Sequence, residues 1–92
     1  IVLDKDIKEE KIVLRADRYH QHYLRTLPLH PSQREIYTSD EYADFELHLR
    51  PTYDFCMELL KVGAMIEVLE PQSLRHQLHG CIKDMWKIYE ND

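Results

Sequence analysis

The sequence predicts an α+β domain, in which a small antiparallel sheet carries helices on one face. Residues 43–50 alternate between apolar and polar side chains, as in a strand with one buried face. Residues 11–16 and 65–69 are rich in branched aliphatic side chains, which are typical of strands. Stretches with helical spacing of apolar residues lie between these segments and after the last one. A length of 92 residues limits the chain to one small domain.

The first unit is a strand followed by a helix. The strand covers residues 11–16, and Asp17 is suited to cap a helix that runs to about Thr26. Apolar side chains that recur every four residues predict the buried stripe of this helix. The stripe comprises Tyr19, Tyr23 and Leu27.

A proline-rich segment, residues 27–33 (Leu-Pro-Leu-His-Pro-Ser-Gln), prevents the helix from continuing and leads into a hairpin. Residues 34–38 are the first strand of the hairpin, and residues 39–42 have the composition of a turn. The alternating segment 43–50 is the second strand. One face of it carries Ala43, Phe45, Leu47 and Leu49, and the other carries Asp44, Glu46, His48 and Arg50.

The second helix is expected over residues 53–62. Thr52 can cap it, and Asp54 in its first turn complements the helix dipole. Gly63 is placed to end it in the left-handed conformation. Its buried side chains are expected to be Phe55, Leu59 and Val62, with Cys56 and Leu60 beside them.

A fourth strand, residues 65–69, precedes the last helix. Pro71 suits the first turn of that helix, which should cover residues 72–89. Gly80 inside it costs about 1 kcal/mol relative to Ala and suggests a close crossing. The apolar stripe comprises Leu74, Leu78, Cys81, Ile82, Met85, Trp86 and Ile88.

The order β-α-β-β-α-β is that of the ferredoxin-like split β-α-β fold, and the chain adds a C-terminal helix to it. Right-handed crossovers would place strands 11–16 and 65–69 centrally or next to each other. The additional helix could cap the open sheet face, pack beside the other helices or reach a second subunit. Residues 1–10 are expected to be the end of an interdomain linker, with a possible short strand at residues 1–3 and a charged segment at residues 4–10, and residues 11–92 are expected to be the domain.

Composition limits the functional classes. A formal net charge of −5 argues against a domain that binds a nucleic-acid duplex by itself, because such binding needs a basic surface. Cys56 and Cys81 lack the spacing of a disulfide framework, so two buried thiols in a reducing cytoplasm are expected. No apolar run reaches the roughly 18–20 residues that span a bilayer. The chain begins without an initiator Met or signal segment, and we interpret it as part of a longer polypeptide.

Six histidines raise the question of a metal site. His76 and His79 are three residues apart on one helix, a spacing that can share a cation, whereas His20 and His22 point apart. Neither pair lies in an HExxH motif, so solvated histidines explain them better, and we expect no metal.

Catalytic motifs are also missing from the sequence. It contains no GxSxG elbow, and two glycines cannot form a glycine-rich phosphate loop. We therefore expect no cofactor and no enzymatic activity. An RNA-recognition domain would need aromatic and basic residues on the open face of strand 43–50, but Phe45 faces the core and Asp44 and Glu46 occupy that face.

Two groups of polar residues are candidates for contacts. Arg15, His48 and Arg50 can form a small polar cluster on the open sheet face, although a solvated or interface-facing sheet explains them more simply. His30, Ser32 and Gln33 lie in the proline-rich segment, where they either bond the loop backbone or contact a partner.

Three motifs together resemble a known family. They are "LHPSQ" at residues 29–33, "GAMIEVLEP" at residues 63–71 and the "LR" pair Leu74–Arg75 in the closing helix. They are similar to the C-terminal extension domain, often called WCX, that follows the WYL domain in bacterial transcriptional regulators. The resemblance covers about residues 11–89, and residues 1–3 resemble the end of the linker that follows the WYL domain.

The resemblance implies a regulatory role. Family members carry an N-terminal helix-turn-helix, a WYL domain with a basic effector pocket and this extension, and they sense an effector, in some cases single-stranded nucleic acid. It further implies homodimerisation and DNA binding by the full-length protein. The candidates for contacts with the WYL domain, a second subunit or an effector phosphate are Arg15, His30, Gln33, His48 and Arg50. The alternative is a ferredoxin-like small-molecule-sensing module, and an independent nucleic-acid binder is disfavoured by the acidic balance.

Overall fold

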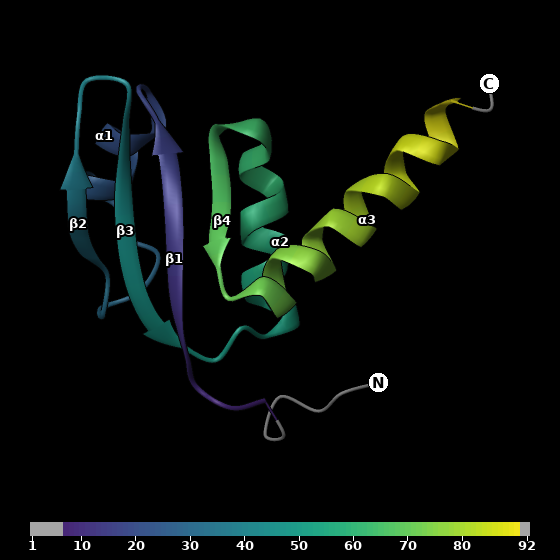
Figure 1. Cartoon of the computed structure of the whole chain (residues 1–92), viewed down its shortest axis with the longest axis horizontal. Helices are drawn as coiled ribbons and strands as arrows, with labels where there is room; N and C mark the ends of the chain where they lie inside the picture. Colours follow the sequence, from purple (N-terminus) through teal and green to yellow (C-terminus); the bar gives the residue numbers. More distant parts are fainter. Residues whose placement is uncertain (1–6, 91–92) are drawn as a thin grey trace.

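The computed structural model describes residues 7–90 of the chain. A four-stranded sheet forms one layer, with α1 and α2 behind it, and α3 extends away from the sheet (Figure 1). The elements are β1 (Glu10–Asp17), α1 (His20–Thr26), β2 (Arg34–Thr38), β3 (Tyr42–Leu49), α2 (Tyr53–Val62), the 3-10 turn η2 (Gly63–Met65), β4 (Ile66–Glu70) and α3 (Gln72–Glu90). The residues expected to form the linker, 1–10, lie mostly outside the described part.

The sheet confirms the expected fold class. Its strand order is β2-β3-β1-β4, and every neighbouring pair is antiparallel. β1 therefore lies between the hairpin and β4, which is the arrangement of a split β-α-β fold. The register slips once within β2, between Glu35 and Tyr37, so that this edge strand carries an irregularity.

One continuous core joins the sheet to the helices. The alternation in β3 is confirmed, because Phe45 and Leu47 are almost fully buried, together with Leu14 of β1. The helices and β4 complete the core with Leu24, Phe55, Cys56, Leu59, Val68 and Leu74. Each buried aliphatic or aromatic side chain contributes about 1.5–3 kcal/mol relative to an exposed one.

The buried stripe predicted for α1 is wrong. Tyr19, Tyr23 and Leu27 are all more than half exposed, and the buried side chains are His20, Gln21 and Leu24. β1 continues to Asp17 and a turn follows, so the helix begins only at His20 and presents a different face to the sheet. Asp17 still caps this turn, because its carboxylate accepts hydrogen bonds from the backbone N–H groups of Tyr19 and His20 at 3.0 and 2.7 Å.

The second helix follows the sequence closely. The Thr52 hydroxyl accepts a hydrogen bond from the Phe55 N–H, Asp54 lies in the first turn, and the helix ends at Val62 as expected. Val62 and Leu60 are only half-buried. Gly63 has a positive φ of 78°, but its ψ of −137° places it outside the left-handed helical region, which corrects the expected cap. Other residue types rarely adopt this combination of angles.

The last helix extends beyond the core. Of its predicted apolar stripe only Leu74 is buried, Leu78 is half-buried and packed against the core, and the residues after it are exposed. Cys81 is therefore exposed and Cys56 alone is buried, in contrast to the expected pair of buried thiols. Gly80 does not mark a close crossing within the described chain, because a Cβ there would meet no atom within 4 Å.

Candidate interdomain contact site

The structure places the five candidate residues in different environments. The sheet register sets Arg15 opposite Asp44 and His48 opposite Lys11, so the two candidates lie four residues apart along their strands. Arg50 follows β3 and lines a pocket with His30. His30 and Arg50 thus line the same pocket, whereas Arg15 is not among its lining residues.

Arg15 is held by neighbours on the open sheet face. Its guanidinium donates to both carboxylate oxygens of Asp44, at 2.8 and 3.1 Å, and lies 4.0 Å from the centre of the Tyr42 ring. Tyr37 stacks on Tyr42 with ring centres 5.3 Å apart. The hydrogen bond with Asp44 raises the pKa of Arg15 above its already high value. A bidentate, stacked arginine of this kind is positioned by the domain itself, not held free for a ligand.

His48 belongs to a second polar group on the same face. Glu46 lies between His48 and Arg34, with N–O distances of 3.0 and 3.3 Å. The contacts with His48 and then Arg34 lower the pKa of Glu46. The open face is therefore a surface of paired charges. It also carries the stacked pair Tyr37 and Tyr42, of which Tyr42 was expected in a turn but begins β3.

The proline-rich segment is fastened to both the sheet and α1. The Ser32 hydroxyl accepts from the His48 N–H at 2.8 Å and donates to the His48 carbonyl at 3.0 Å, while the Ser32 N–H donates to His30 Nδ1 at 3.1 Å. Gln33 accepts from the Leu29 N–H and donates to the Leu24 carbonyl, both at 2.9 Å. Both polar atoms of the Gln33 amide thus bond backbone groups of the segment and of α1. His30 of the same segment lines a pocket with Arg50.

The pocket of His30 and Arg50 has a volume of about 500 Å³ and lies where the proline-rich segment, the end of β3 and the start of α2 meet. Its charged lining is mostly acidic, because three carboxylates surround the single arginine. The lining residues are Glu9, Leu29, His30, Leu49, Arg50, Thr52, Asp54, Phe55 and Glu58. Such a surface attracts a basic group more strongly than a phosphate.

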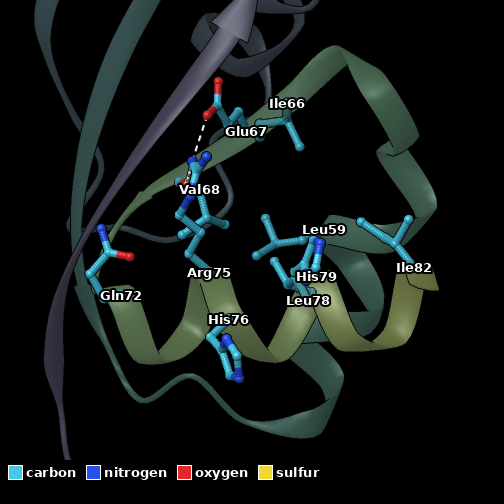
Figure 2. A pocket seen from close by; sticks show the side chains of 10 residues that line it. All are labelled: Leu59, Ile66, Glu67, Val68, Gln72, Arg75, His76, Leu78, His79 and Ile82. Atoms are coloured by element: carbon cyan, nitrogen blue, oxygen red, sulfur yellow. Dashed lines mark hydrogen bonds and ion pairs between the residues drawn. The ribbon is translucent and has the colours of Figure 1, made fainter. Parts of the chain in front are cut away.

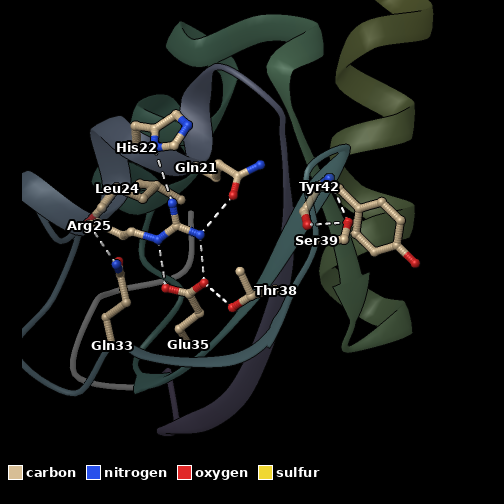
Figure 3. Close-up of polar contacts among 9 residues, drawn as sticks. All are labelled: Gln21, His22, Leu24, Arg25, Gln33, Glu35, Thr38, Ser39 and Tyr42. Atoms are coloured by element: carbon tan, nitrogen blue, oxygen red, sulfur yellow. Dashed lines mark hydrogen bonds and ion pairs between the residues drawn. The ribbon is translucent and has the colours of Figure 1, made fainter.

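Sequence reasoning missed a polar cluster between α1 and β2. Arg25 donates to both carboxylate oxygens of Glu35, at 2.8 and 2.7 Å, and to the Gln21 side-chain oxygen at 2.7 Å (Figure 3). The hydrogen bond from Arg25, assisted by one from Thr38, lowers the pKa of Glu35 from 4.5 to about 2. No sequence signal pairs Arg25 with Glu35, since the proline-rich segment separates them and the alternation in β2 is weak.

A second concave surface lies between β4 and α3. It is a groove of about 330 Å³ with an apolar floor formed by Leu59, Ile66, Val68, Leu78 and Ile82 (Figure 2). Arg75 stands at its rim and donates to the Glu67 carboxylate and to the Val68 carbonyl. These two contacts, which we call the Arg75 clasp, hold the first turn of α3 against β4.

Neither a metal cluster nor a membrane-spanning helix occurs in the described part of the chain. Within residues 7–90, no three His, Cys, Asp or Glu side chains are close enough to share a metal ion. None of the helices there is long and apolar enough to cross a bilayer.

Most of the chain matches a known protein family. The WCX domain family matches residues 8–86 of the chain, which is most of its length. No curated protein shows significant similarity.

Proposed function

The chain belongs to the WCX domain family, whose members are regulatory domains of WYL-type transcriptional regulators, and from that premise we propose a non-enzymatic role in signal transmission. In this proposal the domain helps its regulator to sense an effector and passes the response to an N-terminal helix-turn-helix. The regulator acts on DNA as a homodimer in the bacterial cytoplasm.

The charge of the His30–Arg50 pocket supports a contact with another protein domain. Glu9, Asp54 and Glu58 outnumber Arg50 among its charged lining residues. A phosphate effector would meet net negative charge there, whereas a basic surface would be attracted. The WYL domain carries the basic effector pocket of the family, so it is the partner that we assign to this acidic pocket.

The rigid attachment of the pocket supports a role in transmission. The proline-rich segment is bonded to β3 through Ser32 and to α1 through Gln33. A displacement of His30 by a partner would therefore be passed to the sheet and to α1 instead of being absorbed by the loop. Arg15 and His48 do not line the pocket, and in this proposal they only contribute to the sheet to which the pocket is attached.

The proposal is tested in the full-length regulator with Arg50→Ala and with Asp54→Asn, one change for each sign of charge in the pocket. Asp54→Asn should weaken the effector-dependent change in operator affinity, because it removes a negative charge that attracts the basic surface of the WYL domain. Arg50→Ala leaves the pocket more acidic and should not weaken this change. The loss in Asp54→Asn should be about fivefold or more. Operator binding at graded effector concentrations measures it.

Arg34→Ala is the matched control, since Arg34 is an exposed arginine whose contact is Glu46 on the open sheet face. It should leave the response unchanged. Normal coupling in Asp54→Asn, with folding verified by thermal denaturation, would contradict the assigned contact.

A further inference from the structure

A group of exposed apolar side chains lies on the second half of α3. Trp86, Ile88 and Tyr89 are 61, 70 and 75% exposed, and Ile82 and Met85 are at least half exposed. At 3.6 residues per turn, Leu78, Ile82, Met85 and Tyr89 form one stripe, with Trp86 beside it. We call this surface, residues 78–89, the α3 stripe.

The free half of α3 lacks the packing that usually stabilises a helix. Its first turns are held by Leu74 in the core and by the Arg75 clasp. Beyond Ile82 no apolar side chain of the helix is buried. Most of the stability of a helix in a protein comes from packing of its apolar face, so a partner that covers the stripe would stabilise this half of α3.

The stripe continues directly into the groove between β4 and α3. Leu78 and Ile82 belong to both surfaces, and the floor beyond them is formed by Leu59, Ile66 and Val68 (Figure 2). One face of the molecule therefore presents a projecting apolar ridge beside an apolar depression. A surface that contains both can be its own complement under a two-fold rotation.

We propose that a second copy of this chain covers the α3 stripe, with the free half of each α3 lying against the stripe and groove of its partner. This inference rests on the proposed function, which requires a homodimer, and it names the surface that forms it. The contact is isologous, so both apolar ridges are buried at once.

The available area is adequate for such a contact. The five exposed side chains of the stripe amount to roughly 600 Å² per copy, against about 800 Å² per partner in a specific interface. The groove floor supplies part of the remainder. Trp86 and Tyr89 are also the residue types that most often dominate the binding energy of an interface.

Charge favours a second copy on this side of the molecule. The protein has a net charge of −5, but α3 carries three basic and two acidic residues, which are Arg75, Lys83, Lys87, Asp84 and Glu90. The adjacent strand β4 carries Glu67 and Glu70 and no basic residue. Two copies that meet along α3 thus avoid the stronger repulsion that two acidic surfaces would have at close range.

The test compares Trp86→Ala with Lys87→Ala in the 92-residue chain by sedimentation velocity over a wide range of concentration. The wild-type chain should form a reversible dimer, Trp86→Ala should raise its Kd by about 30-fold or more, and Lys87→Ala should leave it nearly unchanged. Trp86 is largely exposed within one copy, so thermal denaturation of its variant at low concentration should match that of the wild type.

Cys81 provides a second readout. It is exposed and lies along the stripe, whereas Cys56 is buried and serves as an internal reference. The alkylation rate of Cys81 should fall as the wild-type concentration rises through the dimer Kd, and this protection should be lost in Trp86→Ala.

Three results would overturn the inference, and each has a different meaning. A chain that stays monomeric at high concentration excludes self-association through α3. A dimer that is unaffected by Trp86→Ala keeps the homodimer of the proposed function but uses another surface. Protection of Cys81 at all concentrations in the full-length regulator, with the variant equally protected, assigns the stripe to a domain of the same polypeptide.

Discussion

At the scale of single residues, the polar side chains of this domain are mostly paired with one another. Arg15 binds Asp44, Arg25 binds Glu35 and Arg75 binds Glu67. Arg15 is a candidate for contacts on sequence grounds, but its partner Asp44 does not follow from the sequence, because that pairing depends on the register between β1 and β3. His30 and Arg50 line one pocket, and its acidic residues come from α2 and from Glu9, which precedes β1, so sequence order alone does not bring them together.

The Arg25–Glu35 pair makes stability depend on acid pH. Glu35 has a folded-state pKa of about 2, below its usual 4.5, so its contribution is present above pH 4.5 and is lost as the pH falls toward 2. Glu35→Gln should cost on the order of 1 kcal/mol at neutral pH, since this ion pair is partly exposed, and little near pH 2. Urea unfolding at both pH values measures the difference.

Glu41→Gln, in the exposed turn before β3, is the control and should have no such effect. An equal cost of Glu35→Gln at neutral and acid pH would show that the carboxylate charge is not what stabilises the pair.

At the scale of secondary structure elements, the sequence predicted the four strands and three α-helices of the described chain but not the 3-10 turn η2, and the main errors concern which face of a helix is buried. In α1 the two tyrosines suggested an apolar stripe, but a turn at Arg18 and Tyr19 delays the helix and rotates the buried face to His20 and Leu24. In α3 the amphipathic pattern was read correctly, yet periodicity cannot tell whether a stripe is covered by the same chain or by another. Strand β3 was predicted best, because strict alternation ties one face to a core.

Gly80, inside α3, and Gly63, with a positive φ, allow the effects of a glycine-to-alanine change at two kinds of position to be compared. A Cβ at Gly80 meets open space, so Gly80→Ala should stabilise the chain by up to about 1 kcal/mol through better helix propensity. Gly63→Ala should destabilise it by about 1 kcal/mol or more, because φ at Gly63 is 78°. Chemical denaturation of both variants measures the two changes, and a destabilising Gly80→Ala would mean that another chain crosses closely there.

At the scale of the whole molecule, the order of elements was sufficient to predict the split β-α-β topology, and the strand order β2-β3-β1-β4 follows from it. The order of elements does not determine the position of the additional helix, which could cap the open sheet face, pack beside the other helices or reach a second subunit. The structure packs only its first turns beside the core, and this leaves the apolar side chains of its second half exposed.

The net charge sets the salt dependence of self-association. Two copies of a chain with a charge of −5 repel each other, and moderate salt screens that repulsion beyond about 10 Å at 0.1 M. Because the proposed contact along α3 is apolar, added sodium chloride should strengthen the dimer by roughly a few-fold. Sedimentation at low and moderate salt measures this change, and a dimer that weakens with salt would indicate a contact held by ion pairs.

The register slip between Glu35 and Tyr37 in β2 has a consequence for aggregation. An exposed edge strand can recruit the strand of another chain and start an endless sheet. At one edge of this sheet the slip interrupts the regular spacing of N–H and C=O groups, and at the other edge β4 is only five residues long and carries two glutamates. Growth of the sheet from either side is therefore disfavoured, which directs association of this domain toward closed assemblies and away from fibrils.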